Sequence, residues 1–382
     1  MFNNILKLIS IQLTRLLYIN YILLILSILI CTIGLCLLYS AGGGSMDPWG
    51  SKQLIRFLIA IGIYMFVSLV SIKFWIGSSY YIYIFSLFLL ILVNFYGNTG
   101  MGSQRWLNLG FFNLQPSELV KFSLVLVLAR YFHSERDTNF LINCKNFIYS
   151  LFLILLPAYV IFLQPDLGSS LILVIASFSI LFVVGLSIWF FIGSAIIISI
   201  LAPLLWIFFL YDYQKNRVLT FLDPLRDPLG SGYHIIQSKI ALGSGGLFGK
   251  GFLQGTQSHL NFLPEKQTDF VFTMLAEEFG LMGGLTVIIL FMGIISYGYI
   301  ISFFIQSQFG RLLTLGMTAT IFLYVFINIG MVMGIVPIVG VPLPFVSYGG
   351  TALLASMSAI GFIINCYVHR NLKISRFSAG LD

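Results

Sequence analysis

Charged residues are the scarcest class in this 382-residue sequence. Asp, Glu, Lys and Arg together make up 9% of the chain, whereas 59% of the residues are hydrophobic. Soluble globular proteins carry about a quarter charged residues. There are only four cysteines and four histidines, and neither set has the spacing of a disulfide framework or a zinc site. This composition excludes a soluble enzyme and predicts an all-α integral membrane protein with many spans.

Apolar stretches long enough to cross a bilayer recur along the chain. The N-terminus is basic like a signal peptide, but the apolar run that follows is too long for one, so no cleavage is expected. The whole chain, 1–382, is predicted to be one polytopic domain of about ten transmembrane helices. The expected spans are 17–39, 54–72, 79–96, 117–132, 147–164, 167–185, 188–211, 268–302, 311–336 and 345–368.

Basic residues predict the orientation of these spans. With a cytoplasmic N-terminus, ten lysines and arginines fall on the inner side and four fall in the short outer segments, in accord with the positive-inside rule. Both termini are therefore predicted to be cytoplasmic, and the net charge of +7 indicates this asymmetry rather than a nucleic-acid partner. Three outer connections result: 97–116, 337–344 and a large extracytoplasmic loop, 212–267, long enough to fold over the helix ends and carry function.

Four of the thirteen acidic residues lie just before or within one apolar run: Glu265, Asp269, Glu277 and Glu278. Pro264 and Thr268 form a helix-start signal, which predicts Asp269 in the first helical turn, where backbone N–H groups favour a negative charge. From the residues alone, catalysis and helix capping are equally good roles for Asp269. The two later glutamates lie roughly 12–14 Å further along the helix, too far to pair with it.

The residues around this run leave further alternatives open. Thr273, Ala276 and Gly280 share the helix face of Asp269, and indicate either close helix packing or the wall of a groove. The Gly-rich run 244–251 lacks the Walker pattern, and is interpreted as a flexible loop whose amides and Lys250 can approach an anion.

Other polar residues sit where apolar helices begin. Glu118 and Lys121 are three apart in the first turn of the fourth predicted helix, and ionisable residues at such depth usually face a cavity or a partner. Asp166, in a break between two helices, suits both a helix cap and a catalytic role. Arg105 beside Trp106 suits either an interfacial anchor or a phosphate-binding pair.

Taken together, these motifs resemble the SEDS family of shape, elongation, division and sporulation proteins, and the resemblance runs over nearly the whole chain. Two segments, D-Y-Q-K-N-R-V and G-S-G-G-L-F-G-K-G, are similar to the elongation members rather than the division members. The other matching strings are Q-R-W-L at 104–107, Q-P-S-E at 115–118, Q-P-D-L-G at 164–168, D-P-L-G-S-G-Y-H-I-I-Q-S-K-I-A at 227–241, G-K-G-F-L-Q-G-T-Q-S at 249–258, F-L-P-E-K-Q-T-D-F at 262–270 and V-P-L-P-F-V-S-Y-G-G at 341–350.

The resemblance implies an inverting peptidoglycan glycosyltransferase of the bacterial inner membrane, acting in cell elongation and rod-shape maintenance. It would polymerise lipid II and release undecaprenyl pyrophosphate. Asp269 would be the catalytic base. Substrate-binding roles would fall to Arg105, Trp106, Glu118, Lys121, Asp166, Lys239 and Lys250, of which the last two rest on their charge and their place in the matched loop.

A divalent cation, Mg or Mn, is also implied by the resemblance, with ligands that the sequence does not identify. The implied partners are a class B penicillin-binding protein, which is a transpeptidase, and the elongation machinery. Two alternatives stay open: a lipid II flippase, and a non-catalytic scaffold in which Asp269 only caps its helix. Clustering of the charged motifs on one predicted face favours chemistry over transport, because flipping needs access to both faces.

Overall fold

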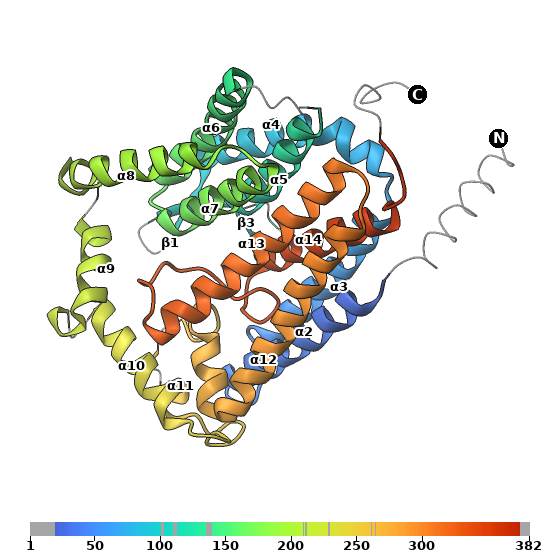
Figure 1. Ribbon diagram of the computed structural model, residues 1–382. Coiled ribbons are helices and arrows are strands. Elements are labelled where there is room, and N and C mark those ends of the chain that lie inside the picture. Colours follow the sequence, from blue (N-terminus) through green and yellow to red (C-terminus); the bar gives the residue numbers. More distant parts are fainter. Residues whose placement is uncertain are drawn as a thin grey trace, which may run out of the picture.

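Long helices form the body of the described part of the chain (Figure 1). The computed structural model describes residues 20–374 except 101–102, 109, 111–112, 135–139, 209, 211, 228–229, 261 and 264. Within these residues the helices of 18 residues or more are α2 (Ile22–Ala41), α3 (Gly50–Leu69), α4 (Ile72–Tyr96), α5 (Pro116–Ser134), α6 (Phe140–Leu163), α7 (Leu167–Val184), α8 (Ile188–Phe208), α12 (Val271–Phe304), α13 (Gln308–Met333) and α14 (Gly350–Val368).

Nine of these ten helices have the length and composition to cross a membrane, counted over the residues that the structure describes. The tenth, α5, is 19 residues long but carries Glu118, Lys121 and Arg130. It packs against α4, α7 and α13 within the bundle. The prediction of an all-α protein with about ten membrane helices is confirmed, although the start of the first predicted span lies outside the described residues.

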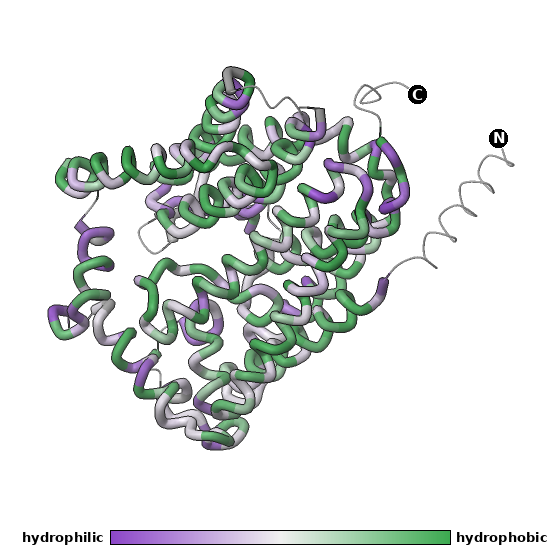
Figure 2. The backbone as a smooth tube through the Cα atoms, in the orientation of Figure 1, coloured by the Kyte–Doolittle hydropathy of each residue, from purple (hydrophilic) through white to green (hydrophobic). Residues whose placement is uncertain are grey.

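The core of the bundle lies on α13 and α14, whose most apolar windows are 67% and 72% buried. At the other extreme, α8 has no buried residue in its window. Figure 2 shows apolar residues along most helices and hydrophilic residues mainly in the connections and at helix ends. An apolar helix surface of this kind is stable only if lipid covers it, which agrees with a multi-pass membrane protein.

The described chain begins and ends on one face of the bundle. The Asn20 side chain, just before α2, is hydrogen-bonded to Tyr297 near the end of α12. Between α12 and α13, the backbone N–H of Gln306 donates to the carbonyl of Arg370, just after α14, at 3.0 Å. An even number of long helices accounts for this placement.

The large loop predicted at 212–267 is itself largely helical. It contains α9 (Asp212–Leu222), the 3₁₀ turn η1 (Pro224–Arg226), α10 (Ser231–Ser244) and the single turn α11 (Thr256–His259). In Figure 1, α9 and α10 form an arc that joins α8 to the start of α12 around the side of the bundle. These elements are too short and too polar to stand out in a search for membrane spans.

The connection between α4 and α5 forms a small antiparallel sheet. Its strands are β1 (Asn98–Gly100), β2 (Ser103–Asn108) and β3 (Asn113–Leu114), with β2 in the middle. The registers pair Thr99 with Gln104 and Leu107 with Leu114. This sheet, which the sequence pattern does not predict, fixes β2 beside the start of α5.

The predicted start of α12 is wrong by a few residues. The helix begins at Val271, so Asp269 lies in the preceding turn and not in the first helical turn. Thr268 does not cap the helix, because its hydroxyl donates to the carbonyl of Glu265 at 3.3 Å. The predicted start of the last span at 345 is wrong for a related reason, since the chain stays irregular up to Gly350 and packs against this turn.

Candidate functional site

A cavity of about 410 Å³ opens between the small sheet, α5, α13 and the turn before α12. It brings together five of the predicted site residues: Arg105, Trp106, Glu118, Lys121 and Asp269. The other lining residues are Gln115, Ser169, Arg217, Glu265, Gln267, Thr268, Tyr324, Gly340, Val341, Pro342, Tyr348, Gly349 and Ala352.

The turn that carries Asp269 is fixed by neighbours distant in the sequence. Asn328 of α13 donates from its side-chain amide to the carbonyls of both Asp269, at 3.1 Å, and Val341, at 2.7 Å. The Ser347 hydroxyl donates to the carbonyl of Thr268 at 2.6 Å. These bonds join the turn to α13 and to the segment before α14, so the carboxylate has a defined position without help from a helix cap.

Gly340 makes room for the Asp269 carboxylate. A Cβ atom at this glycine would lie 3.3 Å from Oδ2 of Asp269, and the glycine has a φ of +73°. Any side chain at position 340 is disfavoured by that contact and by the left-handed backbone conformation. The Pro-rich segment 337–344 thus provides the wall of the cavity directly beside the carboxylate.

The surroundings of Asp269 favour its protonated form. Burial raises the pKa of Asp269 to about 7, and the charge and hydrogen bond of the neighbouring Glu265 act in the same direction. Arg217 and Arg105 act in the opposite direction and lower it. A carboxyl group with a pKa near neutrality can take up and release a proton under physiological conditions, which is the property of a general base.

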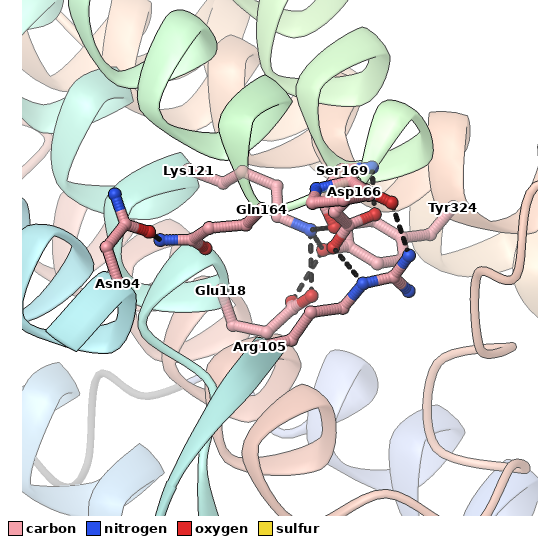
Figure 3. A network of polar contacts seen from close by, with 9 residues as sticks. Asn94, Arg105, Glu118, Lys121, Gln164, Asp166, Ser169 and Tyr324 are labelled. Carbon is pink, nitrogen blue, oxygen red and sulfur yellow. Dashed lines mark hydrogen bonds and ion pairs between the residues drawn. The ribbon is translucent and has the colours of Figure 1, made fainter. Parts of the chain in front are cut away.

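Glu118 and Lys121 form a buried ion pair beside the cavity (Figure 3). The Lys121 Nζ lies 2.7 Å from Oε1 of Glu118, and both residues are 3% exposed. The Tyr324 hydroxyl of α13 donates to the other carboxylate oxygen at 2.5 Å. Lys121 also donates to Tyr324 and, at 3.4 Å, to the Ser169 hydroxyl. The prediction that these two charges are buried and share a helix face is confirmed.

Asp166 and Arg105 extend this network towards the sheet (Figure 3). Asp166 caps α7 by accepting a hydrogen bond from the backbone N–H of Ser169 at 3.2 Å. Its other oxygen lies 3.7 Å from Nε of Arg105. Arg105 also donates to the carbonyl of Pro165 at 2.7 Å, which holds the guanidinium at the edge of the cavity. The capping role expected for Asp166 is therefore present.

Lys250 does not line this cavity. Its Nζ lies 2.8 Å from Oε1 of Glu277, a fully buried carboxylate in α12. The same carboxylate accepts hydrogen bonds from the backbone N–H groups of Gln257 and Ser258 and from the hydroxyls of Thr256 and Ser258. Glu277 therefore holds the end of the α10–α11 connection together with the start of α11, and we refer to these residues, 249–258, as the braced loop.

The braced loop meets α12 where that helix is interrupted. Gly280 has a φ of +67°, which breaks the regular helix. The backbone N–H groups of Lys250 and Gly251 donate to the carbonyls of Glu277 and Glu278, both at 3.0 Å. Just beyond the break, two N–H groups of α12 donate to carbonyls at residues 246 and 247. These backbone groups of α12, on either side of the break, are thus satisfied by residues 246–251.

Two further connections tie this region to its surroundings. Lys266, three residues before Asp269, donates to the carbonyl of Ser258 at 2.7 Å, which joins the braced loop to the Asp269 turn. Glu278 accepts a hydrogen bond from Ser40 of α2. Glu277 therefore holds the braced loop and Glu278 joins α12 to α2, so in the described part of the chain neither pairs with Asp269.

Lys239 also lies away from the cavity. It is an exposed residue of α10, and its side chain runs over Gly334 at the end of α13. The substrate-binding roles predicted for Lys239 and Lys250 therefore lack support from a shared site with Asp269. The charge of a lysine does not show whether its side chain faces the cavity or lies in another part of the protein.

Among the thirteen lining residues that the sequence does not predict as site residues, three ionisable ones interact with the predicted residues: Arg217, Glu265 and Tyr324. Arg217 belongs to the matching string D-Y-Q-K-N-R-V, and Glu265 lies four residues before Asp269, so both carry a signal in their charge and position. Tyr324 lies within a long apolar run and carries no such signal.

Comparison with known proteins identifies the family of this chain. Residues 18–372 match the FtsW, RodA and SpoVE family model, described as a cell cycle protein. The peptidoglycan glycosyltransferase MrdB of Escherichia coli strain K12 is 45% identical over 317 residues, covering 82% of this chain and 85% of that protein.

Solved structures share the fold. One chain, from a peptidoglycan synthase complex that coordinates polymerization and crosslinking, is 29% identical, with a TM-score of 0.77 and coverage of 93% of this chain and 99% of that chain. The rod shape determining protein RodA of Thermus thermophilus is 24% identical, with a TM-score of 0.70 and coverage of 93% and 98%. By its sequence, its helices and its motifs, the chain belongs to the FtsW, RodA and SpoVE family, which is the SEDS family.

Proposed function

We propose that this protein is a peptidoglycan glycosyltransferase that joins the disaccharide units of lipid II into glycan strands and releases undecaprenyl pyrophosphate. The observation that carries the proposal is Asp269, a carboxyl group with a pKa of about 7 at a cavity that Arg105 and Arg217 also line. A base and two cations facing one space suit a reaction in which a hydroxyl loses a proton while a diphosphate leaves.

In the proposed reaction Asp269 acts on the acceptor sugar. Its carboxylate removes the proton of the 4-hydroxyl of the acceptor GlcNAc while that oxygen attacks C1 of the donor MurNAc. The new C–O bond forms as the bond from C1 to the diphosphate oxygen breaks, and the configuration at C1 inverts. The proton remains on Asp269 and the electron pair of the broken bond leaves with the diphosphate.

Arg105 and Arg217 are assigned to the diphosphate. Guanidinium groups pair with phosphate oxygens through two parallel hydrogen bonds, which fixes orientation as well as charge. Trp106 supplies an aromatic surface at the same edge of the cavity. Glu118 and Lys121 already neutralise one another, so their part is to keep the cavity wall polar and rigid and to hold Tyr324 and Ser169 in place.

A divalent cation fits two of the residues at this site. Among the described residues no group of three or more His, Cys, Asp or Glu side chains stands ready to hold a metal. Asp269 and Glu265 nevertheless offer two neighbouring carboxyl groups. Mg²⁺ is commonly held by one or two carboxylates together with substrate phosphates. Bound there with the diphosphate, Mg²⁺ or Mn²⁺ would offset negative charge on the leaving group.

The proposal extends to place and partner. The relatives are peptidoglycan glycosyltransferases, and one structural neighbour belongs to a complex that couples polymerization to crosslinking. We assign the chain to the bacterial inner membrane with the cavity facing outward. A class B penicillin-binding protein of the elongation machinery would crosslink the product.

Purified protein with labelled lipid II and its penicillin-binding partner tests the proposal. Wild-type protein should yield glycan chains on a gel, and Asp269→Ala should yield none while keeping the folded elution volume. Polymer made by Asp269→Ala at the wild-type rate would remove Asp269 from catalysis. Lipid II that changes leaflets without being polymerised would favour a flippase, and absence of both activities in a folded complex would favour a scaffold.

A further inference from the structure

A second cavity, of about 490 Å³, lies between α10, the first half of α12 and the end of α13. None of its lining residues lines the cavity of Asp269. Eleven of the twelve are apolar residues or glycines, and we call this space the α10–α12 groove. They are Leu242, Gly243, Gly246, Phe272, Ala276, Gly280, Leu281, Gly284, Leu285, Ile288 and Met333, and the twelfth is Lys239.

The groove opens towards lipid. Leu281 and Leu285, on the face of α12 that lines it, are 52% and 41% exposed, and α12 is a membrane-spanning helix. Beside its mouth, Leu247 and Phe248 of the α10–α12 connection are 59% and 77% exposed. Side chains this apolar are stable at such exposure only against hydrocarbon, so the groove is continuous with the apolar part of the bilayer.

Lys239 is the only charged residue among those that line the groove. Its aliphatic part runs across Gly334, where a Cβ would come within 2.4 Å of Cε and 2.7 Å of Nζ. No hydrogen bond or ion pair of this ammonium group is found within the described part of the chain. An available cation beside an apolar groove at a membrane surface matches a lipid with one apolar chain and an anionic head group.

We propose that the α10–α12 groove binds the chain of a polyprenyl phosphate, with its phosphate at Lys239. This inference rests on the proposed function, which makes such a lipid part of the substrate and of the product. One groove of about 490 Å³ with one cation suits one chain with one head group better than a two-chain phospholipid. Phe272, which lines the groove, follows Asp269 by three residues in the chain, so the groove and the Asp269 cavity are lined by consecutive parts of one segment.

The chain offers a position from which a larger side chain would enter the groove. Gly243 lies in α10 with an ordinary helical backbone, and a Cβ added there would meet no other atom within 4 Å. Gly243→Leu therefore projects into the space that the lipid chain would occupy. Gly62→Leu is the matched control, because Gly62 also lies in a long helix with the same free space around a Cβ, and it lines neither cavity.

Binding of labelled undecaprenyl phosphate to full-length protein in phosphatidylcholine nanodiscs tests the groove directly. Gly243→Leu should raise the Kd about tenfold, and Lys239→Gln should raise it about tenfold through loss of a charged hydrogen bond. Gly62→Leu and the exposed Lys52→Gln should bind like wild type. Lys239→Arg should restore most of the affinity.

Three outcomes overturn the proposal: wild-type affinity in Gly243→Leu, wild-type affinity in Lys239→Gln, or equally good competition by phosphatidylglycerol, which would indicate a general phospholipid site. The binding assay needs no turnover, so Asp269→Ala should bind undecaprenyl phosphate normally. Failure of the glycosyltransferase proposal would appear as missing polymer with intact binding, whereas failure of the groove would appear as unchanged binding in variants that still polymerise.

Discussion

Asp269 and Glu277 are carboxylates eight positions apart in one stretch of chain, yet their surroundings differ completely. Glu277 is fully buried, pairs with Lys250 and accepts four more hydrogen bonds from the braced loop. Asp269 faces an open cavity, next to another carboxyl group, with arginines that lower but do not abolish the rise in its pKa. A carboxylate whose charge is already satisfied stabilises structure, whereas one whose charge is left unsatisfied is available for chemistry.

The largest effect on stability should follow from removing the satisfied carboxylate. Glu277→Ala leaves the Lys250 ammonium and several loop donors without their acceptor, which should lower the free energy of unfolding by about 3–5 kcal/mol. Thermal unfolding in detergent measures this change. Glu277→Gln removes the charge but keeps an oxygen acceptor, so it should cost less than Glu277→Ala, and wild-type stability in Glu277→Gln would argue against a charge-dependent brace.

The position of Asp269 depends on Asn328. A substitution at Asn328 therefore tests the placement of the Asp269 carboxylate while leaving the carboxylate itself in the protein. Asn328→Leu removes the two hydrogen bonds to the carbonyls of Asp269 and Val341, and should lower the polymerisation rate about tenfold by misplacing the base. The loss should appear in kcat more than in KM. Thr320→Val, a buried change on the same helix, should leave the rate unchanged.

The charges around Asp269 should move the pH dependence of polymerisation in opposite directions. Activity requires the carboxylate, so it should fall as the pH drops through about 7, the raised pKa of Asp269. Glu265→Gln removes a charge that raises this pKa and should shift the acidic limb to lower pH by up to about one unit. Arg217→Gln removes a charge that lowers the pKa and should shift the limb to higher pH. Shifts in the same direction would contradict this electrostatic account.

The smallest effect concerns the stability cost of Asp269 itself. Its pKa is raised from 3.8 to about 7 on folding, so the folded state binds more protons than the unfolded state between these values, and stability falls as the pH rises through this window. Asp269→Asn removes this penalty and should stabilise the protein by about 1 kcal/mol at pH 8, less than the roughly 4 kcal/mol of the full shift, because Asp269 is only partly buried and solvent screens its charge. At pH 4 the variant and wild type should unfold alike. A variant less stable than wild type at pH 8 would be inconsistent with a raised pKa.

Much of the fold can be predicted from the sequence because membrane spans are a property of composition. All ten predicted spans correspond to long helices, and Glu118 with Lys121 is identifiable as a buried pair because charge within an apolar helix needs a partner. Helix ends are less predictable. The start of α12 depends on Ser347 and Asn328, which are more than fifty residues away and donate to the carbonyls of Thr268 and Asp269 that a helix starting at Thr268 would use for its own hydrogen bonds.

The candidate site shows the same limit. The matched motifs link Asp269, Arg105 and Trp106 to one site. They do not reveal which carboxylate or cavity a lysine or arginine side chain will face. Lys250 belongs to a matched string and is directed to Glu277, whereas Arg217, in another string, faces the cavity. The pairing of acidic with basic residues depends on the break at Gly280 and on the arc of α9 and α10. Local sequence predicts neither feature.

The most direct test of the central claim is the polymerisation rate of Asp269→Asn with lipid II and the penicillin-binding partner, compared with Glu277→Gln in the same assay. Asparagine keeps the shape of the side chain and removes the base. The account predicts a loss of about 10²-fold to 10⁴-fold for Asp269→Asn in a folded protein, and a far smaller loss for Glu277→Gln. Glycan chains formed by Asp269→Asn at the wild-type rate would contradict it.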